Sequence, residues 1–320
     1  MNLVGADQLA AILTPELVIA ALVEAFRGGI KAPLRHHHTI EREGGETATL
    51  LLMPAWHETG VSETGHIGVK VVSVFPNNDA RAKPTIGGAY LLLSGATGEV
   101  DAVMDAPSLT LWRTAAASAL AASYLARPQA SHLVMVGAGS LAPHLIKAHA
   151  AVRPIKKVTI WNRNGAKAKT LAAELSAAMS KLDISASDDL EAAIRAADIV
   201  SAATLSREPL IRGAWLSPGV HVDLVGGYTP AMREADDEAV RRSAVFVDTR
   251  EGATREAGDI VQPLERKVIT REDIKADLFD LCRNIHPGRE SETQITLFKS
   301  VGTAIEDLAL ATLVYRRLFC

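Results

Sequence analysis

The stretch that decides the fold reads HLVMVGAGSLAPHL and spans residues 132–145. Its apolar first part suits a buried strand, and the part that follows the two glycines suits a helix. Glycines at such a turn let the backbone approach a pyrophosphate, whose charge then sits at the helix N-terminus. A lone GxGxxA pattern is weak evidence, but here the strand, the helix and a following strand are all present. The candidate cofactor contacts of this turn are Gly137, Ala138, Gly139, Ser140 and Leu141.

From about residue 108 onward, short apolar runs alternate with helical stretches. The apolar runs are HLVMV, KVTIWN, DISAS, DIVSAAT, GVHVDLV and AVFVDT. Near-continuous apolar strands separated by helices are typical of a parallel sheet that is covered on both faces. We therefore expect an α/β fold with a Rossmann-type, doubly wound parallel sheet.

The first hundred residues combine a helix with β-rich runs. TPELVIAALVEAFRGG (14–29) predicts the helix, with Thr14 as N-cap, Pro15 at its first position and a Gly pair after its end. TATLLLMPAW, GHIGVKVVSVFP and IGGAYLLLSGATGEVDAVMD predict strands, with SGATGE as a hairpin turn. The last segment, SVGTAIEDLALATLVYRR, predicts a helix with no strand after it. We expect that helix to pack against the first domain.

Length, charge and cysteine content narrow the class of protein. A chain of 320 residues exceeds the roughly 250–300 residues at which one core usually stops growing, so two domains are expected, with one large domain as the alternative. The net charge of −3 gives no basic face for nucleic acid or an anionic membrane. The N-terminus does not resemble a signal peptide, and no apolar run approaches the ~20 residues of a membrane helix. Cys282 and Cys320 lack metal-ligand spacing. We expect a cytoplasmic protein without nucleic-acid or membrane partners.

The end of the run KVTIWN and the residues after it bear on cofactor choice. An acidic residue at this position would bond the ribose 2′-hydroxyl of NAD, whereas Asn162, Arg163 and Asn164 offer neutral and cationic groups that suit a 2′-phosphate. The sequence therefore favours NADPH, with NADH as the alternative cofactor. The alternative is that Arg163 is a solvated turn residue with no role in cofactor binding.

Three cationic residues lie near breaks in the first domain: Arg35, Lys70 and Arg113. Strand alternation points Lys70 inward, where an unpaired ammonium is costly, so an anionic group should face it. The alternatives are a snorkelling lysine and two arginines in ordinary ion pairs.

The triplet His36-His37-His38 invites a metal interpretation. Neighbours in a strand point to opposite faces, so at most two of these rings could share a metal. We predict no metal site.

Many stretches of the chain resemble one family. They are APLR, GVKVVSVFPNN, KPTIGGAYLLLSGATGEVDAVMDAPSLTLWRTAAASALAA, VGAGSLA, IWNR, VGGYTPAMREAD, EAGDI and ITLFKSVGTAIEDLA. Their order and extent resemble the ornithine cyclodeaminase and mu-crystallin family, which includes pyrroline-carboxylate and ketimine reductases. The resemblance implies a Rossmann NAD(P)-binding domain at residues 111–302. It is inserted in an α+β domain, 1–110 with 303–320, that binds substrate and forms a homodimer.

The resemblance also implies roles for individual residues. Arg35, Lys70 and Arg113 look like the family's carboxylate-binding cations, and Val301 looks like a backbone contact of the substrate. Three cations around one carboxylate would supply the anion that Lys70 requires. The implied cofactor contacts are Thr85 beside the nicotinamide, Arg113, Ser140, Thr204, Val225, Gly226 and Ser300. Catalytic roles fall on Lys70, Arg113, Thr85 and Tyr228.

Tyr228 departs from the pattern of the cyclodeaminases. Those enzymes carry an aspartate after the Gly pair of VGGYTP, and a phenol with an ordinary pKa of about 10 cannot replace it as a base near neutral pH. VGGYTP also looks like the version found in pyrroline-carboxylate reductases. Whether the phenol donates a proton, bonds a water or fills volume is open, with filling the preferred explanation.

The resemblance and this departure together imply an activity. It is the NAD(P)H-dependent reduction of the cyclic imino acid Δ1-pyrroline-2-carboxylate to L-proline, with the six-membered piperideine homologue as a further substrate. The alternatives are ornithine or lysine cyclodeaminase, alanine dehydrogenase or an acyclic ketimine reductase, and a non-enzymatic mu-crystallin-like ligand binder.

Overall fold

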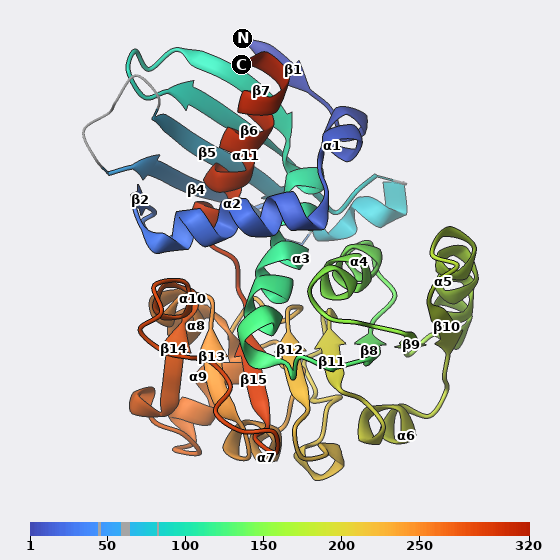
Figure 1. The fold of residues 1–320 in the computed structure, drawn as a ribbon. Coiled ribbons are helices and arrows are strands. Elements are labelled where there is room, and N and C mark those ends of the chain that lie inside the picture. Colours follow the sequence, from blue (N-terminus) through green and yellow to red (C-terminus); the bar gives the residue numbers. More distant parts are fainter. Residues whose placement is uncertain (44–45, 59–64, 82) are drawn as a thin grey trace. The chain divides into compact units, whose positions relative to one another are not determined.

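The computed structural model describes residues 1–43, 46–58, 65–81 and 83–320. The chain forms two compact units (Figure 1): unit 1 comprises Met1–Arg113 with Thr303–Cys320, and unit 2 comprises Thr114–Gly302. The first boundary lies at residues 113/114 rather than 110/111. It falls inside a long helix, α3 (Ala106–Leu125), where no loop marks it in the sequence.

Within the described residues, unit 1 is built on a seven-stranded sheet, sheet A, in the order β1-β7-β6-β5-β4-β2, with β3 also paired to β4. Its strands are β1 (Asn2–Val4), β2 (Ile30–Lys31), β3 (His36–Ile40), β4 (Ala48–His57), β5 (His66–Val74), β6 (Ile86–Ser94) and β7 (Val100–Asp105). Its helices are α1 (Ala6–Ile12), α2 (Pro15–Arg27), the start of α3, the 3-10 turn Pro76–Arg81 and α11 (Ala304–Phe319). Pairing is antiparallel except between β1 and β7.

The local signals in unit 1 act as the sequence predicts. The Thr14 side chain accepts a hydrogen bond from Leu17 N, Pro15 opens α2, and Gly28 follows its last residue. The turn between β6 and β7 joins two antiparallel strands. The last helix, α11, packs against α2 and β5 and buries its apolar side. The two ends of the chain therefore complete one core.

Unit 2 contains a parallel sheet, sheet B, which has eight strands in the described residues, in the order β10-β9-β8-β11-β12-β15-β13-β14. The strands are β8 (His132–Val136), β9 (Lys157–Trp161), β10 (Asp183–Ala186), β11 (Ile199–Ala202), β12 (His221–Leu224), β13 (Ala244–Val247), β14 (Ile274–Asp277) and β15 (Thr296–Lys299). The helices are α4 (Ala142–Val152), α5 (Gly165–Ala178), α6 (Leu190–Arg195), α7 (Asp237–Arg241), α8 (Arg250–Glu256), α9 (Gly258–Glu265) and α10 (Leu278–Cys282), with 3-10 turns at Gly213–Trp215 and Arg271–Asp273. This is the predicted Rossmann-type α/β fold.

The strands of sheet B are short and buried on both faces. Val134, Val200, Val222 and Leu297 have no exposed surface, as expected for central strands with helices on either side. The sequence prediction misses β14 and β15. β15 is the more consequential omission because it inserts between β12 and β13, out of chain order. Four residues leading directly into a helical segment carry too little pattern to predict a strand.

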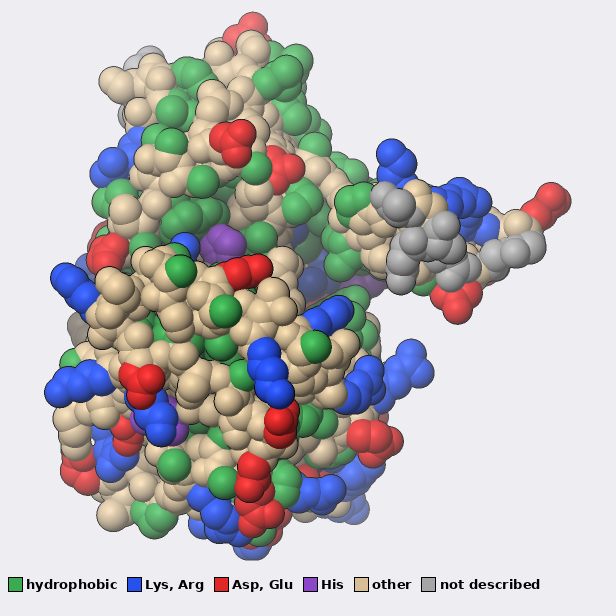
Figure 2. Space-filling model, turned by 90° about the vertical axis from the view of Figure 1, so that its right-hand side faces the viewer, with side chains coloured by type: hydrophobic (Ala, Val, Ile, Leu, Met, Phe, Trp, Pro, Cys, Tyr) green, Lys and Arg blue, Asp and Glu red, His purple; other side chains and the backbone are tan. Residues whose placement is uncertain are grey.

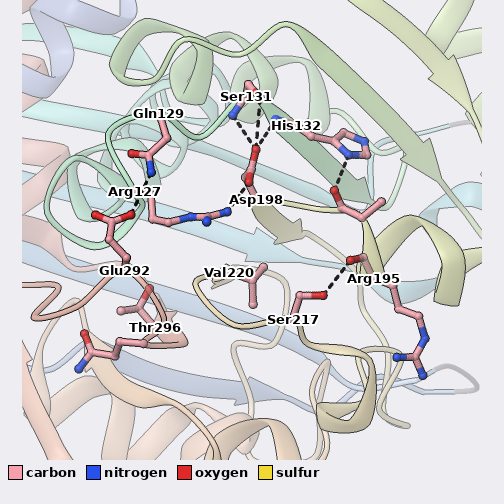
Figure 3. Close-up of polar contacts among 12 residues, drawn as sticks. Arg127, Gln129, Ser131, His132, Arg195, Asp198, Ser217, Val220, Glu292 and Thr296 are labelled. Atoms are coloured by element: carbon pink, nitrogen blue, oxygen red, sulfur yellow. Dashed lines mark hydrogen bonds and ion pairs between the residues drawn. The ribbon is translucent and has the colours of Figure 1, made fainter.

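The amino ends of β8 and β11 are joined by one carboxylate (Figure 3). Asp198, just before β11, accepts hydrogen bonds from Ser131 N at 2.8 Å and His132 N at 3.0 Å, and it pairs with Arg127. Burial opposes ionisation, but these N–H groups and the guanidinium together lower the pKa of Asp198. This brace lies at the amino edge of sheet B, the opposite edge from the glycine turn.

The surface carries charges of both signs. On the face drawn in Figure 2, lysines and arginines are interspersed with aspartates and glutamates. In the described parts of the chain no single helix is long and apolar enough to cross a membrane, although α1 and α2, bent by 91°, meet that test of length and composition as a pair.

Candidate functional site

Unit 1 holds a buried cluster of opposite charges beneath sheet A. Lys70 on β5 donates a hydrogen bond to Oδ1 of Asp307 at 2.9 Å, and its Nζ lies 2.8 Å from Oδ2. Arg113 on α3 donates through Nε to the same Oδ1 at 3.2 Å and through a terminal nitrogen to Glu306 at 2.7 Å. The two carboxylates come from the first turn of α11. The structure thus brings two predicted cations together and adds two acids that the sequence prediction missed.

Burial sets the protonation behaviour of this cluster. Lys70 is 2% exposed, and burial together with the nearby Arg113 lowers its pKa to about 8, against the opposing effect of Asp307. Burial alone would raise the pKa of Asp307, but Lys70 and Arg113 lower it overall. The anionic group expected opposite Lys70 is therefore present in the protein itself.

Arg35 lies between β2 and β3 and contributes to the electrostatic environment of both Lys70 and Asp307. Three cations, Arg35, Lys70 and Arg113, thus act on Asp307, and Arg113 also pairs with Glu306. A concentration of cations of this kind suits a bound anion. Thr85 lies just before β6, and its carbonyl accepts a hydrogen bond from Phe75 N at 2.8 Å.

Tyr90 on β6 packs beside this cluster. Its register partner across the sheet is Lys70, and its ring is fully buried. A Cβ added to Gly68 would lie 1.9 Å from the Tyr90 hydroxyl oxygen, so only glycine leaves room for the phenol. Burial and the charge of Asp307 raise the pKa of Tyr90 well above its usual value. The phenol therefore stays neutral next to the charged groups.

In unit 2, the predicted cofactor residues, together with Tyr228 and Val301, follow the carboxyl ends of parallel strands, which share one edge of sheet B. The residues are Gly137, Ala138, Gly139, Ser140 and Leu141 after β8; Asn162, Arg163 and Asn164 after β9; Thr204 after β11; Val225, Gly226 and Tyr228 after β12; and Ser300 and Val301 after β15. Open α/β sheets bind ligands at this edge, where the strand order reverses. Here the reversal lies between β8 and β11.

The glycine turn has the backbone and the space that a dinucleotide needs. Gly137 has φ +115°, and a Cβ there would lie 2.7 Å from the Ala203 carbonyl oxygen. A Cβ added to Gly139 would meet no described protein atom within 4 Å, which leaves space beside the N-terminus of α4. Gly226 is confined by a close approach of Thr204, whose carbonyl oxygen would lie 1.9 Å from an added Cβ.

The segment after β9 is exposed and ordered by its own contacts. Asn164 caps α5 by accepting a hydrogen bond from Ala166 N at 3.1 Å, and Asn162 donates to the Asn164 carbonyl at 3.0 Å. Arg163, between them, is exposed. Its side chain is accessible to a 2′-phosphate, but the alternative of a solvated turn residue also fits.

Two further carboxylates that the sequence prediction missed hold these loops. Asp248, after β13, accepts hydrogen bonds from Ser300 Oγ at 3.2 Å and from the Val301 and Gly302 N–H groups at 2.7 Å each. Glu234 accepts from Thr204 and Gly226. Glu234 stands with Asp236, Asp237 and Glu238 around the start of α7, and acidic residues are common at ordinary helix starts.

The histidine triplet has no partner set for a metal. His36, His37 and His38 lie on the exposed strand β3, and burial and the nearby Arg35 lower the pKa of His37. Among the described residues, no group of three metal-ligating side chains occurs.

Sequence comparison identifies the family of the chain. The model of the ornithine cyclodeaminase/mu-crystallin family matches residues 4–319. The chain belongs to this family.

Individual relatives are similar over almost the whole chain. Delta(1)-pyrroline-2-carboxylate reductase of Paracoccus denitrificans is 40% identical over 91% of this chain and 92% of its own. The Thermococcus litoralis structure of that reductase in complex with NADH and L-proline is 35% identical, with a TM-score of 0.91 over 99% of this chain and 97% of its own. An archaeal alanine dehydrogenase dimer with bound NAD is 31% identical, with a TM-score of 0.87 over 99% of this chain and 95% of its own.

Breaking the charge cluster of unit 1 should be costly. Asp307→Ala leaves two buried cations short of a counter-ion, so we expect the free energy of unfolding to fall by about 3–5 kcal/mol, measured by urea denaturation at pH 7. The double variant Lys70→Met/Asp307→Leu removes both charges and should lose much less. Glu24→Ala, which removes an exposed pair with Arg27, is the control and should change stability by less than about 1 kcal/mol. Equal effects of Asp307→Ala and Glu24→Ala would contradict this account.

Proposed function

We propose that the protein is an NAD(P)H-dependent imine reductase that converts Δ1-pyrroline-2-carboxylate to L-proline. The proposal is supported by the 40% identical reductase and by the 35% identical reductase structure that holds NADH and L-proline. Tyr228 carries the choice of reduction over deamination, because a phenol stands after the Gly pair at the carboxyl end of β12. Expulsion of an amine calls for a carboxylate there, whereas reduction of a preformed imine does not.

The three cations of unit 1 suit the substrate carboxylate. Arg35, Lys70 and Arg113 would hold it by charge-assisted hydrogen bonds. A small anionic imine is thereby favoured over a neutral one.

The carboxyl edge of sheet B suits a nicotinamide dinucleotide. Residues 137–141 would hold the pyrophosphate at the N-terminus of α4, and Thr204, Val225, Gly226 and Ser300 would surround the nicotinamide end. The bound cofactor supplies a hydride. C2 of the protonated imine accepts it, the C=N π electrons become the amine lone pair, and the proton already on nitrogen remains as the N–H of L-proline.

The role of the protein in this step is to position the substrate. A protonated imine carries its own electrophilic activation, so fixing the carboxylate orients C2 without a further acid. Tyr228 would fill the volume that an amine side chain occupies in a deaminase. The described residues of unit 1 thus offer charge, and the loops of unit 2 offer backbone contacts.

The activity is tested by following NADPH and NADH oxidation with the five- and six-membered cyclic imines. We expect turnover with the five-membered ring and faster reaction with NADPH, because Arg163 suits a 2′-phosphate. A parallel incubation with ornithine and catalytic NAD⁺ should release no ammonia. Release of ammonia and proline without added reductant would replace reduction by cyclodeamination, and equal use of both cofactors would argue against the role of Arg163.

The pKa of Lys70 predicts the alkaline side of the pH profile. As the pH rises through about 8, Lys70 loses its proton and its charge, so kcat/KM for the imine should fall. Lys70→Arg keeps the positive charge to above pH 12, so its profile should lose that descending limb. Lys70→Met should reduce kcat/KM by about a hundredfold at pH 7. A limb near pH 8 that persists in Lys70→Arg would assign the titration to another group.

A homodimer is supported by the face of sheet A opposite α11. Leu52, Val69, Val71 and Leu91 point to that face and are only half-buried. An open apolar sheet face calls for a partner surface. We expect light scattering to give about 68 kDa, twice the 34.0 kDa of one chain, and a mass of one chain would refute the dimer.

A further inference from the structure

A buried ionic group lies directly behind the loops that follow β11 and β12 in unit 2. Oε1 of Glu234 accepts hydrogen bonds from the Thr204 N–H at 2.7 Å and the Thr204 hydroxyl at 2.8 Å, and Oε2 accepts from the Gly226 N–H at 2.8 Å. The carboxylate therefore joins two loops that come from neighbouring strands of sheet B.

The backbone that carries the Glu234 side chain is itself held in place. Oδ1 of Asp259, on α9, accepts hydrogen bonds from Glu234 N at 2.8 Å and Ala235 N at 3.0 Å. Lys299, at the end of β15, lies 3.3 Å from Oδ2 of Asp259. Glu234, Asp259 and Lys299 have no exposed surface. Residues of α9 and β15 thus hold Glu234, and Glu234 in turn holds the Thr204 and Gly226 loops.

Glycine is required where this group meets the loop. A Cβ on Gly226 would lie 2.6 Å from Oε1 of Glu234, and one on Gly227 would lie 3.1 Å from Oδ2 of Asp259 and 3.5 Å from the Lys299 ammonium. The Gly pair that precedes Tyr228 therefore packs directly on the ionic group. The backbone position of the two glycines is therefore set by Glu234, Asp259 and Lys299, because the glycines have no side chains to anchor them.

Burying an ion in this way is costly, so its retention calls for an explanation. An apolar residue would fill the volume, but it would leave the Thr204 and Gly226 N–H groups without their acceptor. A carboxylate accepts several hydrogen bonds at fixed angles and fixes both loops at once. We propose that Glu234, supported by Asp259 and Lys299, is a positioning residue that sets the Thr204 and Gly226 loops for the nicotinamide end of the cofactor. The inference rests on the cofactor assigned in the proposed function.

The charges around Glu234 define how it titrates. Burial raises its pKa to about 7, Lys299 opposes that rise, and Asp259 adds to it. Above pH 7 the carboxylate accepts all three hydrogen bonds with its full charge. Below pH 7 the bound proton weakens them, because charge-assisted hydrogen bonds are roughly twice as strong as neutral ones. Cofactor affinity should therefore fall as the pH drops through about 7.

The test is direct binding of NADH and NADPH, measured by nicotinamide fluorescence from pH 5.5 to 9 without imine. Glu234→Gln keeps the shape of the side chain but replaces one carboxylate oxygen by an NH₂ group. That group then faces either the Thr204 N–H or the Gly226 N–H, and two donors cannot form a hydrogen bond. We expect its Kd at pH 8 to rise by about tenfold and its pH dependence near 7 to disappear. Glu265→Gln, at the exposed end of α9, is the matched control and should bind like the wild type. Circular dichroism confirms that each variant is folded.

Two further measurements separate positioning from a general structural role. In the Glu234→Gln variant, KM for the cofactor should rise while KM for the imine stays within about twofold. Lys299→Met removes the charge that opposes the pKa rise, so its affinity should begin to fall at a higher pH than in the wild type.

An unchanged Kd in folded Glu234→Gln, or a wild-type Kd that is flat across pH 7, would overturn the inference. So would a wild-type protein that binds neither cofactor. Weaker binding in the variant combined with no turnover of any imine would leave this inference standing and refute only the proposed activity.

Discussion

The burial of the Lys70 ammonium is the constraint on which unit 1 depends. An unpaired charge at 2% exposure is not tolerated, and the only acid that hydrogen-bonds it among the described residues is Asp307, 237 positions further along the chain. This pair, extended by Arg113 and Glu306, ties the first strands to the last helix. A domain made from both ends of the chain follows from that pairing, with the parallel sheet placed between the two segments in sequence.

In unit 2 as well, buried polar groups need partners, and there the groups are backbone N–H groups. Backbone N–H groups beyond the strand ends must find acceptors, and Glu234 and Asp248 provide them. Both acids are fully buried and accept hydrogen bonds from the loops. The candidate ligand residues are thus supported from behind by carboxylates, in unit 1 by Asp307 and in unit 2 by Glu234 and Asp248.

Patterns that act over a few residues were predictable from the sequence. Thr14 and Pro15 start α2, the run before Gly137 is β8, and strand alternation alone points Lys70 inward. The partners of those residues were not predictable, because ion pairs such as Lys70 with Asp307 join positions whose spacing carries no period. The sequence prediction missed the short strand β15 for a related reason, because its place between β12 and β13 is decided by tertiary pairing. The candidate ligand residues thus stay predictions that rest on local patterns and on the family resemblance, whereas their supports come from long-range contacts.

The discontinuous make-up of unit 1 has a consequence for biosynthesis. At roughly 5–20 residues per second, the ribosome adds Asp307 about 10–50 s after Lys70. During that interval the whole of unit 2 is synthesised and can fold, while sheet A has its inward lysine and no α11 to cover it. The nascent first domain therefore exposes apolar strands until α11 has been added, which gives chaperones a reason to bind it during that interval.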